Sequence, residues 1–387
     1  MMKKAMIISC FSWYENRLKP IKEHLQGSYE VHCFTSDFIH TTKEYIGQKN
    51  PDLEYVHVPA YRKNISIKRF ISYICFGKEI EKKLRELNPD LVYLVLPPNN
   101  TAYRCLKYKK RHSDCKYYID LIDLWPESMP LNEKYNKSIL FRQWAGLRDE
   151  SIRAADHVFV ECNYYREQLR GILDEANSTV LYLTRGITDD EKKLVESKYR
   201  KRAGIGSSIS LCYLGSINHI IDIDKICKLI EELKMRGITV ELKIIGDGES
   251  RDELMLKTKA VGAEVEYYGK VYDQTKKIEL IGSCDYGLNM YTSRVAVGLT
   301  IKSIDYFSMG IPIINTIQGD TWELVGNNQV GINCDDCIKE CVDDMLNVKY
   351  DYWENAYKLY LDSFSHEAFY RTIDRVFADK GFLDVEK

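Results

Sequence analysis

The chain has 387 residues, of which 45% are hydrophobic and 29% charged, and this composition excludes a disordered or collagen-like protein. A chain of this length is expected to form roughly two domains. The net charge of -2 divides unevenly, because residues 1–185 hold 29 Lys and Arg against 23 Asp and Glu, whereas the remainder holds 26 against 34. Unless this unevenness is random, the basic first part favours an anionic partner such as phosphate, phosphorylated lipid or a membrane surface.

The N-terminal run MMKKAMIISCF has the basic start and apolar stretch of a secretory signal, but the stretch is short and charged residues follow it. We therefore expect it to form the first core strand. No apolar run approaches the roughly 18–20 residues that span a bilayer. The 12 Cys lack paired spacing, as in proteins of a reducing compartment. The sequence predicts a cytoplasmic protein that could contact the inner face of the plasma membrane peripherally.

Strands and helices alternate through the first half of the chain. Hydrophobic periodicity predicts strands over residues 5–10, 29–35, 54–58, 91–96, 116–121, 157–161 and 180–183. Helices are expected over residues 18–25, 65–87, 101–110, 139–155 and 163–173. This alternation is typical of a parallel sheet with helices on both faces, and it predicts a first Rossmann-like domain over residues 1–188.

A polar stretch over residues 188–202 is the predicted domain boundary. The alternation then resumes, and it predicts a second Rossmann-like domain over residues 205–350. Its strands are expected over residues 209–214, 239–245, 265–268, 286–290 and 311–314, and its helices over residues 223–235, 251–261 and 276–282 and after Thr300. Helices over residues 352–362 and 367–377 form a C-terminal segment, residues 351–387. Ligands of such sheets bind at the carboxyl ends of the strands.

The segment from Val297 to Asn315 places a short helix directly before a buried strand. Thr300 can cap the start of this helix, and Lys302 and Asp305 share one of its faces because they are three residues apart. A helix N-terminus that carries a lysine is suited to a diphosphate, and an acid one turn later can hold a ribose hydroxyl. The alternative is an ordinary α/β unit with a surface lysine and aspartate.

Three glycine-containing loops precede this segment, and each follows a predicted strand. A glycine at such a place lets a ligand approach the backbone, although glycine after a strand is usually only a turn. None of the loops forms a dinucleotide-binding GxGxxG or a P-loop GxxxxGK[ST] pattern. The candidate donor-binding residues are Gly215, Ser216 and Asn218 in the first loop, Gly246, Asp247 and Gly248 in the second, and Gly269 and Val271 in the third.

The second half resembles the donor domain of family 4 glycosyltransferases with the GT-B fold, through Leu214-Gly215-Ser216, Gly246-Asp247-Gly248-Glu249, Tyr268-Gly269-Lys270-Val271 and Gly310-x-Pro312 in this order. The first half resembles bacterial members that build capsular and surface polysaccharides, through Asp123-Leu124-Trp125-Pro126-Glu127-Ser128. The resemblance covers nearly the whole chain. It implies an α/β protein with two facing Rossmann-like doubly wound domains, the first for the acceptor and the second for the donor. It also implies that the C-terminal helices cross back to the first domain.

The family transfers a sugar from a nucleotide sugar with retention at the anomeric carbon, and it needs no metal or cofactor. The resemblance implies a hexosyltransferase with a UDP- or GDP-type donor, in which Lys302 neutralises the diphosphate and Asp305 holds the ribose. The first acid of the family falls at Val297 and is missing. Backbone amides can still cradle phosphate. The further residues expected at the donor are Gly298 and Leu299, through their amides, and Arg294, as a second cation.

The chain departs from the family at further places besides Val297. Asn218, His219 and Asp222 stand where the family has an arginine and a lysine, which shifts charge stabilisation onto Arg294 and Lys302. Ile122 stands where many relatives have a histidine.

Polar residues of the first domain are candidates for catalysis and for contact with the acceptor. Asp123 is the catalytic candidate, and Trp125 and Glu127 are expected in the cleft. The alternative is that Asp123 caps a turn and Trp125 fills the core. Asn16 and Arg17 could touch the donor phosphate or the acceptor, or could equally cap the helix that follows them.

The expected helix over residues 65–85 mixes isoleucine and phenylalanine with lysine and arginine. It could lie on an anionic membrane, or it could face the core and present a solvated basic face. No nucleic-acid-binding motif accompanies this charge, and no His or Cys spacing indicates a metal site.

The sequence thus predicts a retaining glycosyltransferase that extends a lipid-linked bacterial polysaccharide. The alternatives are a nucleotide-sugar epimerase of the same fold and an inactive GT-B-like protein that binds a nucleotide sugar or a partner.

Overall fold

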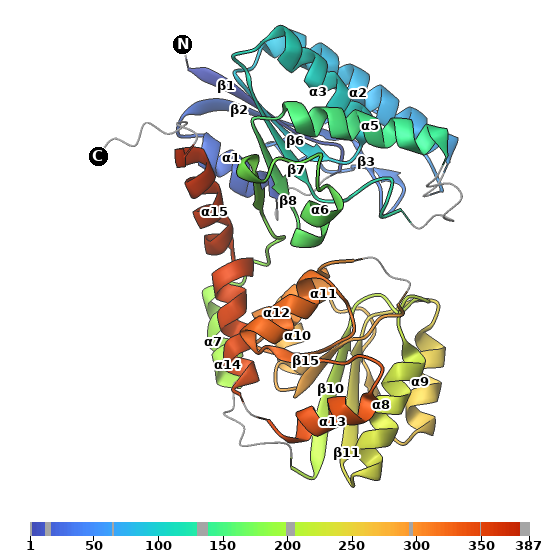
Figure 1. The fold of residues 1–387 in the computed structure, drawn as a ribbon. Helices are drawn as coiled ribbons and strands as arrows, with labels where there is room; N and C mark the ends of the chain where they lie inside the picture. The colour runs from blue at the N-terminus through green and yellow to red at the C-terminus, as the bar shows by residue number, and fades with distance from the viewer. Residues whose placement is uncertain are drawn as a thin grey trace. The chain divides into compact units, whose positions relative to one another are not determined.

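The computed structural model describes residues 2–11, 17–63, 66–129, 138–198, 206–293, 297–348 and 350–379. The chain divides into two compact units, each built on its own parallel sheet (Figure 1). Unit 1 comprises Met1–Leu183 and Phe369–Lys387, and unit 2 comprises Thr184–Ala368. The chain therefore passes from unit 1 to unit 2 after Leu183 and returns to unit 1 after Ala368, inside the last helix.

Unit 1 contains a seven-stranded sheet in which all neighbouring strands pair in parallel. The strand order reverses between β1 and β6, as in doubly wound sheets. Across the sheet the strands are β5 (Glu54–Val56), β2 (Tyr29–Ser36), β1 (Lys3–Ser9), β6 (Leu91–Leu96), β7 (Lys116–Leu121), β8 (His157–Val160) and β9 (Ser178–Val180). A separate antiparallel pair is formed by β3 (Phe38–Ile39) and β4 (Glu44–Tyr45).

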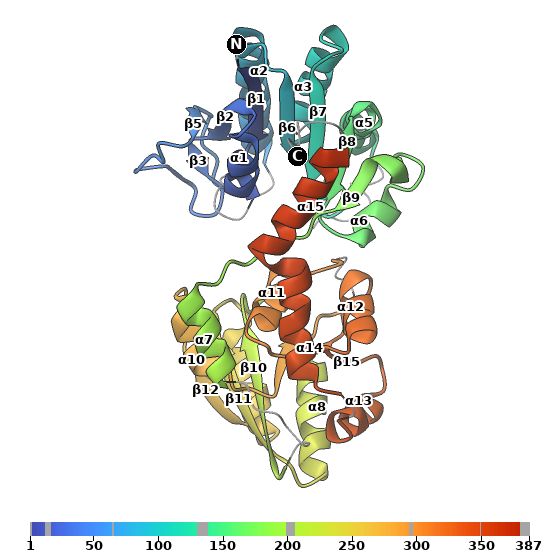
Figure 2. The ribbon, with the colours of Figure 1, turned by 90° about the vertical axis from the view of Figure 1, so that its left-hand side faces the viewer.

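Successive side chains of the unit 1 strands point to opposite faces of the sheet, and this divides its core into two clusters. In β1, Met6 and Ile8 belong to one cluster, whereas Ala5 and Ile7 belong to the other. The first cluster lies under α2 (Ile67–Leu87), α3 (Asn99–Arg111) and α5 (Ile139–Ala154), which run side by side in Figure 1. The second is covered by α1 (Lys19–Leu25) and by the part of α15 (His366–Asp379) from Phe369 onward (Figure 2). The remaining helices in the described part of this unit are α6 (Asn163–Gln168) and the short η2 (Glu175–Asn177).

Unit 2 contains a six-stranded sheet, also parallel throughout, whose order reverses between β10 and β13. Across the sheet the strands are β12 (Glu264–Tyr267), β11 (Thr239–Ile245), β10 (Ser208–Leu214), β13 (Tyr286–Asn289), β14 (Ile313–Asn315) and β15 (Gly331–Asn333). The helices are α7 (Asp189–Lys198), α8 (Ile223–Met235), α9 (Arg251–Ala260), α10 (Gln274–Ile281), α11 (Ile301–Ser308), α12 (Asp320–Asn328), α13 (Ile338–Leu346), α14 (Tyr352–Leu359) and η3 (Tyr360–Phe364).

Several elements differ from those predicted. The polar stretch after residue 188 forms α7, because Thr188 and Glu191 make a reciprocal capping box: each backbone N–H donates to the other's side chain, at 2.7 and 3.2 Å. Helix α6 ends at Gln168, five residues before the predicted end, and β9 begins at Ser178 instead of residue 180. Helices α12 and α13 and strands β3, β4 and β15 were not predicted from the sequence. Within the described ranges, no helix is both long and apolar enough to cross a membrane.

Candidate functional site

The loops that follow four neighbouring strands of the unit 2 sheet surround a pocket of about 580 Å³, which α11 completes. We call it the α11 pocket. It includes the loops after β10 and β13, where the strand order reverses, and sheets of this type bind ligands at that position. The predicted residues that line it are Gly215, Ser216, Asn218, Gly246, Asp247, Val271, Lys302 and Asp305.

Backbone hydrogen bonds join the three glycine loops to one another. The N–H of Gly215 donates to Ile245 O at 2.9 Å, and the N–H of Gly246 donates to Gly269 O at 2.8 Å. A Cβ on Gly246 would lie 1.8 Å from Gly215 O, and one on Gly248 would lie 2.1 Å from Ile217 O. Glycine is therefore needed at these two positions because one loop packs closely on the next. The approach of a ligand is not the reason. The packed loops form a rigid wall.

Lys302 lies in the first turn of α11, whose N-cap Thr300 accepts a hydrogen bond from the backbone N–H of Ser303. Its ammonium lies 4.2 Å from the ring centre of Tyr213 and 4.6 Å from that of Tyr291, and it donates to the Tyr213 hydroxyl at 3.1 Å. Among the residues that the structure describes, no carboxylate pairs with Lys302. Burial therefore lowers the pKa of Lys302 to about 7. Such a lysine gains strongly from an anion that enters the pocket.

Asp305 lies one turn after Lys302 on the same helix and is only 7% exposed. Burial raises the pKa of its carboxyl, and the nearby cations Arg185 and Lys277 oppose this rise. The Arg185 guanidinium donates through Nε to Asp305 Oδ1 at 2.5 Å, and Nη2 contacts the same oxygen. Both contacts end on Oδ1. The second carboxylate oxygen, Oδ2, can therefore accept a hydrogen bond from a ligand in the pocket that Asp305 lines.

Several polar residues at this site were not among the predicted site residues, including Tyr213, Tyr291, Arg185, Lys270 and Lys277. Tyr213 lies near the end of β10 and Tyr291 two residues after β13, and these positions at the carboxyl ends of two strands were a usable signal. Arg185 gave no local signal, because it lies 120 residues from Asp305 in the chain. Its backbone is fixed instead by η3, where the Arg185 N–H donates to Phe364 O and the Tyr360 hydroxyl donates to Arg185 O.

Some predicted donor residues do not line the α11 pocket. Gly298 is buried, and its carbonyl accepts hydrogen bonds from the backbone N–H and hydroxyl of Thr321, at 2.8 and 2.7 Å. Leu299 is 6% exposed. The two hydrogen bonds from Thr321 to Gly298 fix the loop before α11 to the start of α12. Gly248 and Gly269 support the loops from outside the lining. Arg294 and Asn16 lie outside the described residues.

Arg17 is fully buried in unit 1 and forms a two-point ion pair with Asp120, at 2.7 and 2.5 Å. Its third nitrogen donates to the carbonyls of Leu181 and Tyr182. These contacts occupy the guanidinium inside the unit. They favour a structural role over contact with a phosphate or an acceptor, and that role differs from the helix cap considered from the sequence.

Asp123, Trp125 and Glu127 all follow β7, at the carboxyl edge of the unit 1 sheet. The Ser128 hydroxyl donates to the Asp123 carboxyl, and burial raises the pKa of that carboxyl. Trp125 packs under the guanidinium of Arg69, 4.7 Å from its ring centre. Glu127 accepts a two-point hydrogen bond from Arg148, at 2.6 and 2.9 Å. The Ser128 hydroxyl thus holds the Asp123 carboxyl within the loop after β7, at the ligand-binding edge of the sheet.

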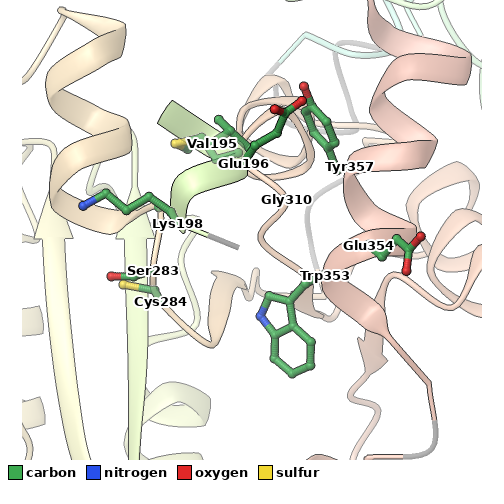
Figure 3. Close-up of a pocket in the computed structure, with 11 residues that line it drawn as sticks. Val195, Glu196, Lys198, Ser283, Cys284, Gly310, Trp353, Glu354 and Tyr357 are labelled. Carbon is green, nitrogen blue, oxygen red and sulfur yellow. The ribbon is translucent and has the colours of Figure 1, made fainter. Parts of the chain in front are cut away.

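A second pocket, of about 330 Å³, lies at the other end of α11 (Figure 3). Trp353, Glu354 and Tyr357 of α14 and Lys198 of α7 flank it. Lys198 is the single lysine or arginine among its described lining residues, whereas Lys270, Lys277 and Lys302 line the α11 pocket. The α11 pocket is therefore the better site for a multiply charged anion.

Comparison with known proteins relates the chain to glycosyltransferases. Residues 208–349 match the family model described as "Glycosyl transferases group 1". The chain has no significant match among curated proteins.

Solved structures match nearly the whole chain at low sequence identity. Sucrose-phosphate synthase from Thermosynechococcus elongatus has a TM-score of 0.65 at 11% identity, with 98% of this chain and 99% of that chain covered. The apo form of the lipopolysaccharide outer core galactosyltransferase WaaB has a TM-score of 0.65 at 16% identity, with 98% and 100% covered. Anabaena HepE in complex with UDP and glucose has a TM-score of 0.62 at 13% identity, with 97% and 99% covered. These likenesses confirm the predicted fold class of two Rossmann-like domains with parallel sheets, the GT-B fold.

Proposed function

We propose that the protein is a retaining glycosyltransferase that binds a nucleotide-sugar donor in the α11 pocket. The observation that carries this proposal is the buried Lys302 at the start of α11, in a pocket at the strand reversal, where none of the described carboxylates pairs with it. The matched family model covers this pocket, and one structural neighbour is a complex with UDP and glucose. Lysine and the N-terminus of a helix both stabilise a diphosphate.

In the proposed reaction, the sugar–phosphate bond breaks and negative charge develops on the departing diphosphate. Lys302 and the N–H groups at the start of α11 neutralise this charge, which is the main requirement for such a leaving group. Asp305 accepts a hydrogen bond from a ribose hydroxyl, and the wall of packed loops holds the nucleotide. We propose that the reaction needs no metal or cofactor and that Asp123 lies close to the reacting sugar. Arg294, which is outside the described residues, remains the proposed second cation.

The finer assignments rest on the resemblance of the sequence to family 4 glycosyltransferases that build capsular and surface polysaccharides. They are a UDP- or GDP-type hexosyl donor and a lipid-linked glycan acceptor of the bacterial cell envelope. We propose the cytoplasmic face of the membrane as the place of reaction and unit 1 as the acceptor side.

A thermal-shift screen against nucleotide sugars tests the proposal. A ligand that binds only the folded protein raises its apparent stability by mass action, so the correct base and sugar should give the largest shift. Release of the nucleoside diphosphate should then depend on a lipid-linked acceptor. Binding without release would favour the non-catalytic alternative, for which the missing acid at Val297 is the specific observation.

Donor binding should take up a proton above neutral pH. Because the pKa of Lys302 is about 7 in the empty pocket, a bound diphosphate will raise it and favour the protonated form. Affinity should be constant below about pH 6 and should fall as the pH rises beyond about 7. Calorimetry at about pH 8 in buffers of different ionisation enthalpy should show uptake of nearly one proton. A Lys302→Arg variant that still binds should show none, because arginine stays charged; equal uptake in both proteins would contradict this assignment.

Replacement of Arg185 by glutamine should weaken donor binding more than catalysis. Without its cation, the buried Asp305 loses both orientation and charge, so KM for the donor should rise roughly tenfold while kcat changes less than about threefold. Arg185→Lys should recover part of the loss. Steady-state kinetics measure both constants. A lower KM would instead show that Arg185 competes with the ribose for Asp305.

A further inference from the structure

Helix α2 presents apolar side chains on two of its faces. One face carries Tyr73, Phe76, Ile80 and Leu84 into the core of unit 1. The other carries Ile67, Ile71 and Ile74, which are 79%, 45% and 44% exposed. Their spacing of four and three residues places them in one stripe along the helix. A surface helix of a globular protein normally turns one apolar face inward and a polar face outward, so the second stripe requires an explanation.

The start of α5 also exposes apolar side chains. Ile139 and Leu140 are 66% and 76% exposed. Phe70 of α2 and Trp144 of α5 touch with ring centres 5.1 Å apart, which brings the N-terminal parts of the two helices together. Single exposed apolar residues are ordinary, but a cluster on adjoining helices marks an interaction site. We call the cluster of Ile67, Ile71, Ile74, Ile139 and Leu140 the isoleucine surface.

Basic residues surround the isoleucine surface. Residues 55–78 contain five Lys and Arg and no Asp or Glu. Of these five, Arg62, Lys63, Lys68 and Lys78 are exposed, as is Arg142 on α5.

The second half of α2 is different. There Lys82 and Lys83 pair with Glu86, and Arg85 pairs with Glu81, as on an ordinary solvated surface. Counting only partners among the described residues, the positive charge of α2 that lacks an ion pair is confined to the part of the helix that also exposes isoleucine.

We propose that the isoleucine surface docks unit 1 on an anionic lipid bilayer. Aliphatic side chains enter the boundary of the acyl chains while the surrounding lysines and arginines meet anionic headgroups. A second copy of the chain is a poorer occupant, because a two-fold contact would bring the same basic residues face to face. This placement refines the sequence hypothesis for the helix, since only its first half takes part.

The location of the isoleucine surface suits a lipid-linked acceptor, and this part of the inference rests on the proposed function. Helices α2 and α5 precede parallel strands β6 and β8, so their N-termini lie toward the carboxyl edge of the sheet. Trp144 lies 6.1 Å from Trp125, ring centre to ring centre, and Trp125 follows β7 at that edge. A lipid-linked sugar could therefore reach Asp123 and Trp125 from the bilayer without complete extraction.

Vesicle sedimentation of the full chain tests the docking surface directly. We expect binding to vesicles of phosphatidylcholine with about one-third phosphatidylglycerol, and at least tenfold weaker binding to phosphatidylcholine alone. Ile71→Asp together with Ile74→Asp should weaken binding at least tenfold. Leu256→Asp in unit 2 is the matched control, because Leu256 is 70% exposed but lies on α9, and it should leave binding unchanged. Lys68→Ala with Lys78→Ala should weaken binding and reduce its dependence on salt.

Equal sedimentation of the wild-type protein and the Ile71/Ile74 variant would overturn the proposal, as would absence of wild-type binding to the vesicles that contain phosphatidylglycerol. A dimer that dissociates in the isoleucine variant, without vesicle binding, would assign the surface to a second copy instead. The nucleotide-sugar thermal shift separates this inference from the proposed function. It should persist in the isoleucine variant, and a wild-type protein that shows the shift but no vesicle binding would refute only the docking surface.

Discussion

Replacement of Lys302 by methionine should make the empty protein more stable and should abolish its stabilisation by nucleotide sugars. The folded-state pKa of Lys302 is about 7, below the unfolded value of 10.5, so its charge costs folding free energy. At about pH 7 the apolar methionine should raise the free energy of unfolding by on the order of 1–3 kcal/mol, as measured by chemical denaturation. Turnover should fall by about 10²–10³-fold, because a stabiliser of the leaving diphosphate is lost.

The pH dependence of the Lys302→Met effect identifies its cause. The cost of the charged lysine is fully present below about pH 7 and disappears as the pH rises toward 10.5, so the stability gain should shrink over that interval. Lys270→Met is the matched control, because Lys270 also lines the pocket but its side chain is 58% exposed. It should change stability by less than about 0.5 kcal/mol. A Lys302→Met protein with full turnover would remove the proposed phosphate role.

Replacement of Arg17 by methionine should destabilise unit 1 severely. Both partners of the Arg17–Asp120 pair are fully buried, and Tyr93 also donates to Asp120 at 2.8 Å. Removal of the guanidinium leaves a buried carboxylate without its cation and two carbonyls without a donor. We expect a loss of about 3–5 kcal/mol in urea unfolding followed by tryptophan fluorescence.

The exposed pair Lys193–Asp190 provides the control for Arg17. Both side chains of this pair are at least 75% exposed, so Lys193→Met should change the free energy of unfolding by less than about 0.5 kcal/mol. If Arg17→Met folds with wild-type stability but loses activity toward the acceptor, Arg17 contacts a ligand and the structural assignment is wrong.

Local patterns in the sequence predicted most elements and part of the site. Thr300, Lys302 and Asp305 could be placed on the start of one helix because capping and spacing act over a few residues. The alternation of apolar runs indicated two parallel sheets, and the glycine loops fell at their carboxyl edges. The helix α7 was also predictable, since Thr188 and Glu191 have the spacing of a capping box, but the charge of the stretch favoured a linker.

The features that could not be predicted depend on residues far apart in the chain. Arg17 and Asp120 are 103 residues apart, and Arg185 and Asp305 are 120 apart. Nothing in the local pattern distinguishes such an arginine from one on the surface, because only the folded sheet brings its partner within reach. The exposed stripe of α2 was hidden for the same reason: Ile71 and Phe76 have similar hydrophobicity, and only the position of the sheet separates the exposed face from the buried one.

The central claim is that the α11 pocket holds the diphosphate of a nucleotide sugar. A crystal structure of the protein with the nucleotide sugar that gives the largest thermal shift tests it most directly. We predict that the diphosphate lies within hydrogen-bond distance of Lys302 Nζ, beside the Gly215 loop, with a ribose hydroxyl on Asp305. A nucleotide bound in the pocket of Figure 3, or one that leaves Lys302 without contact, would contradict the account.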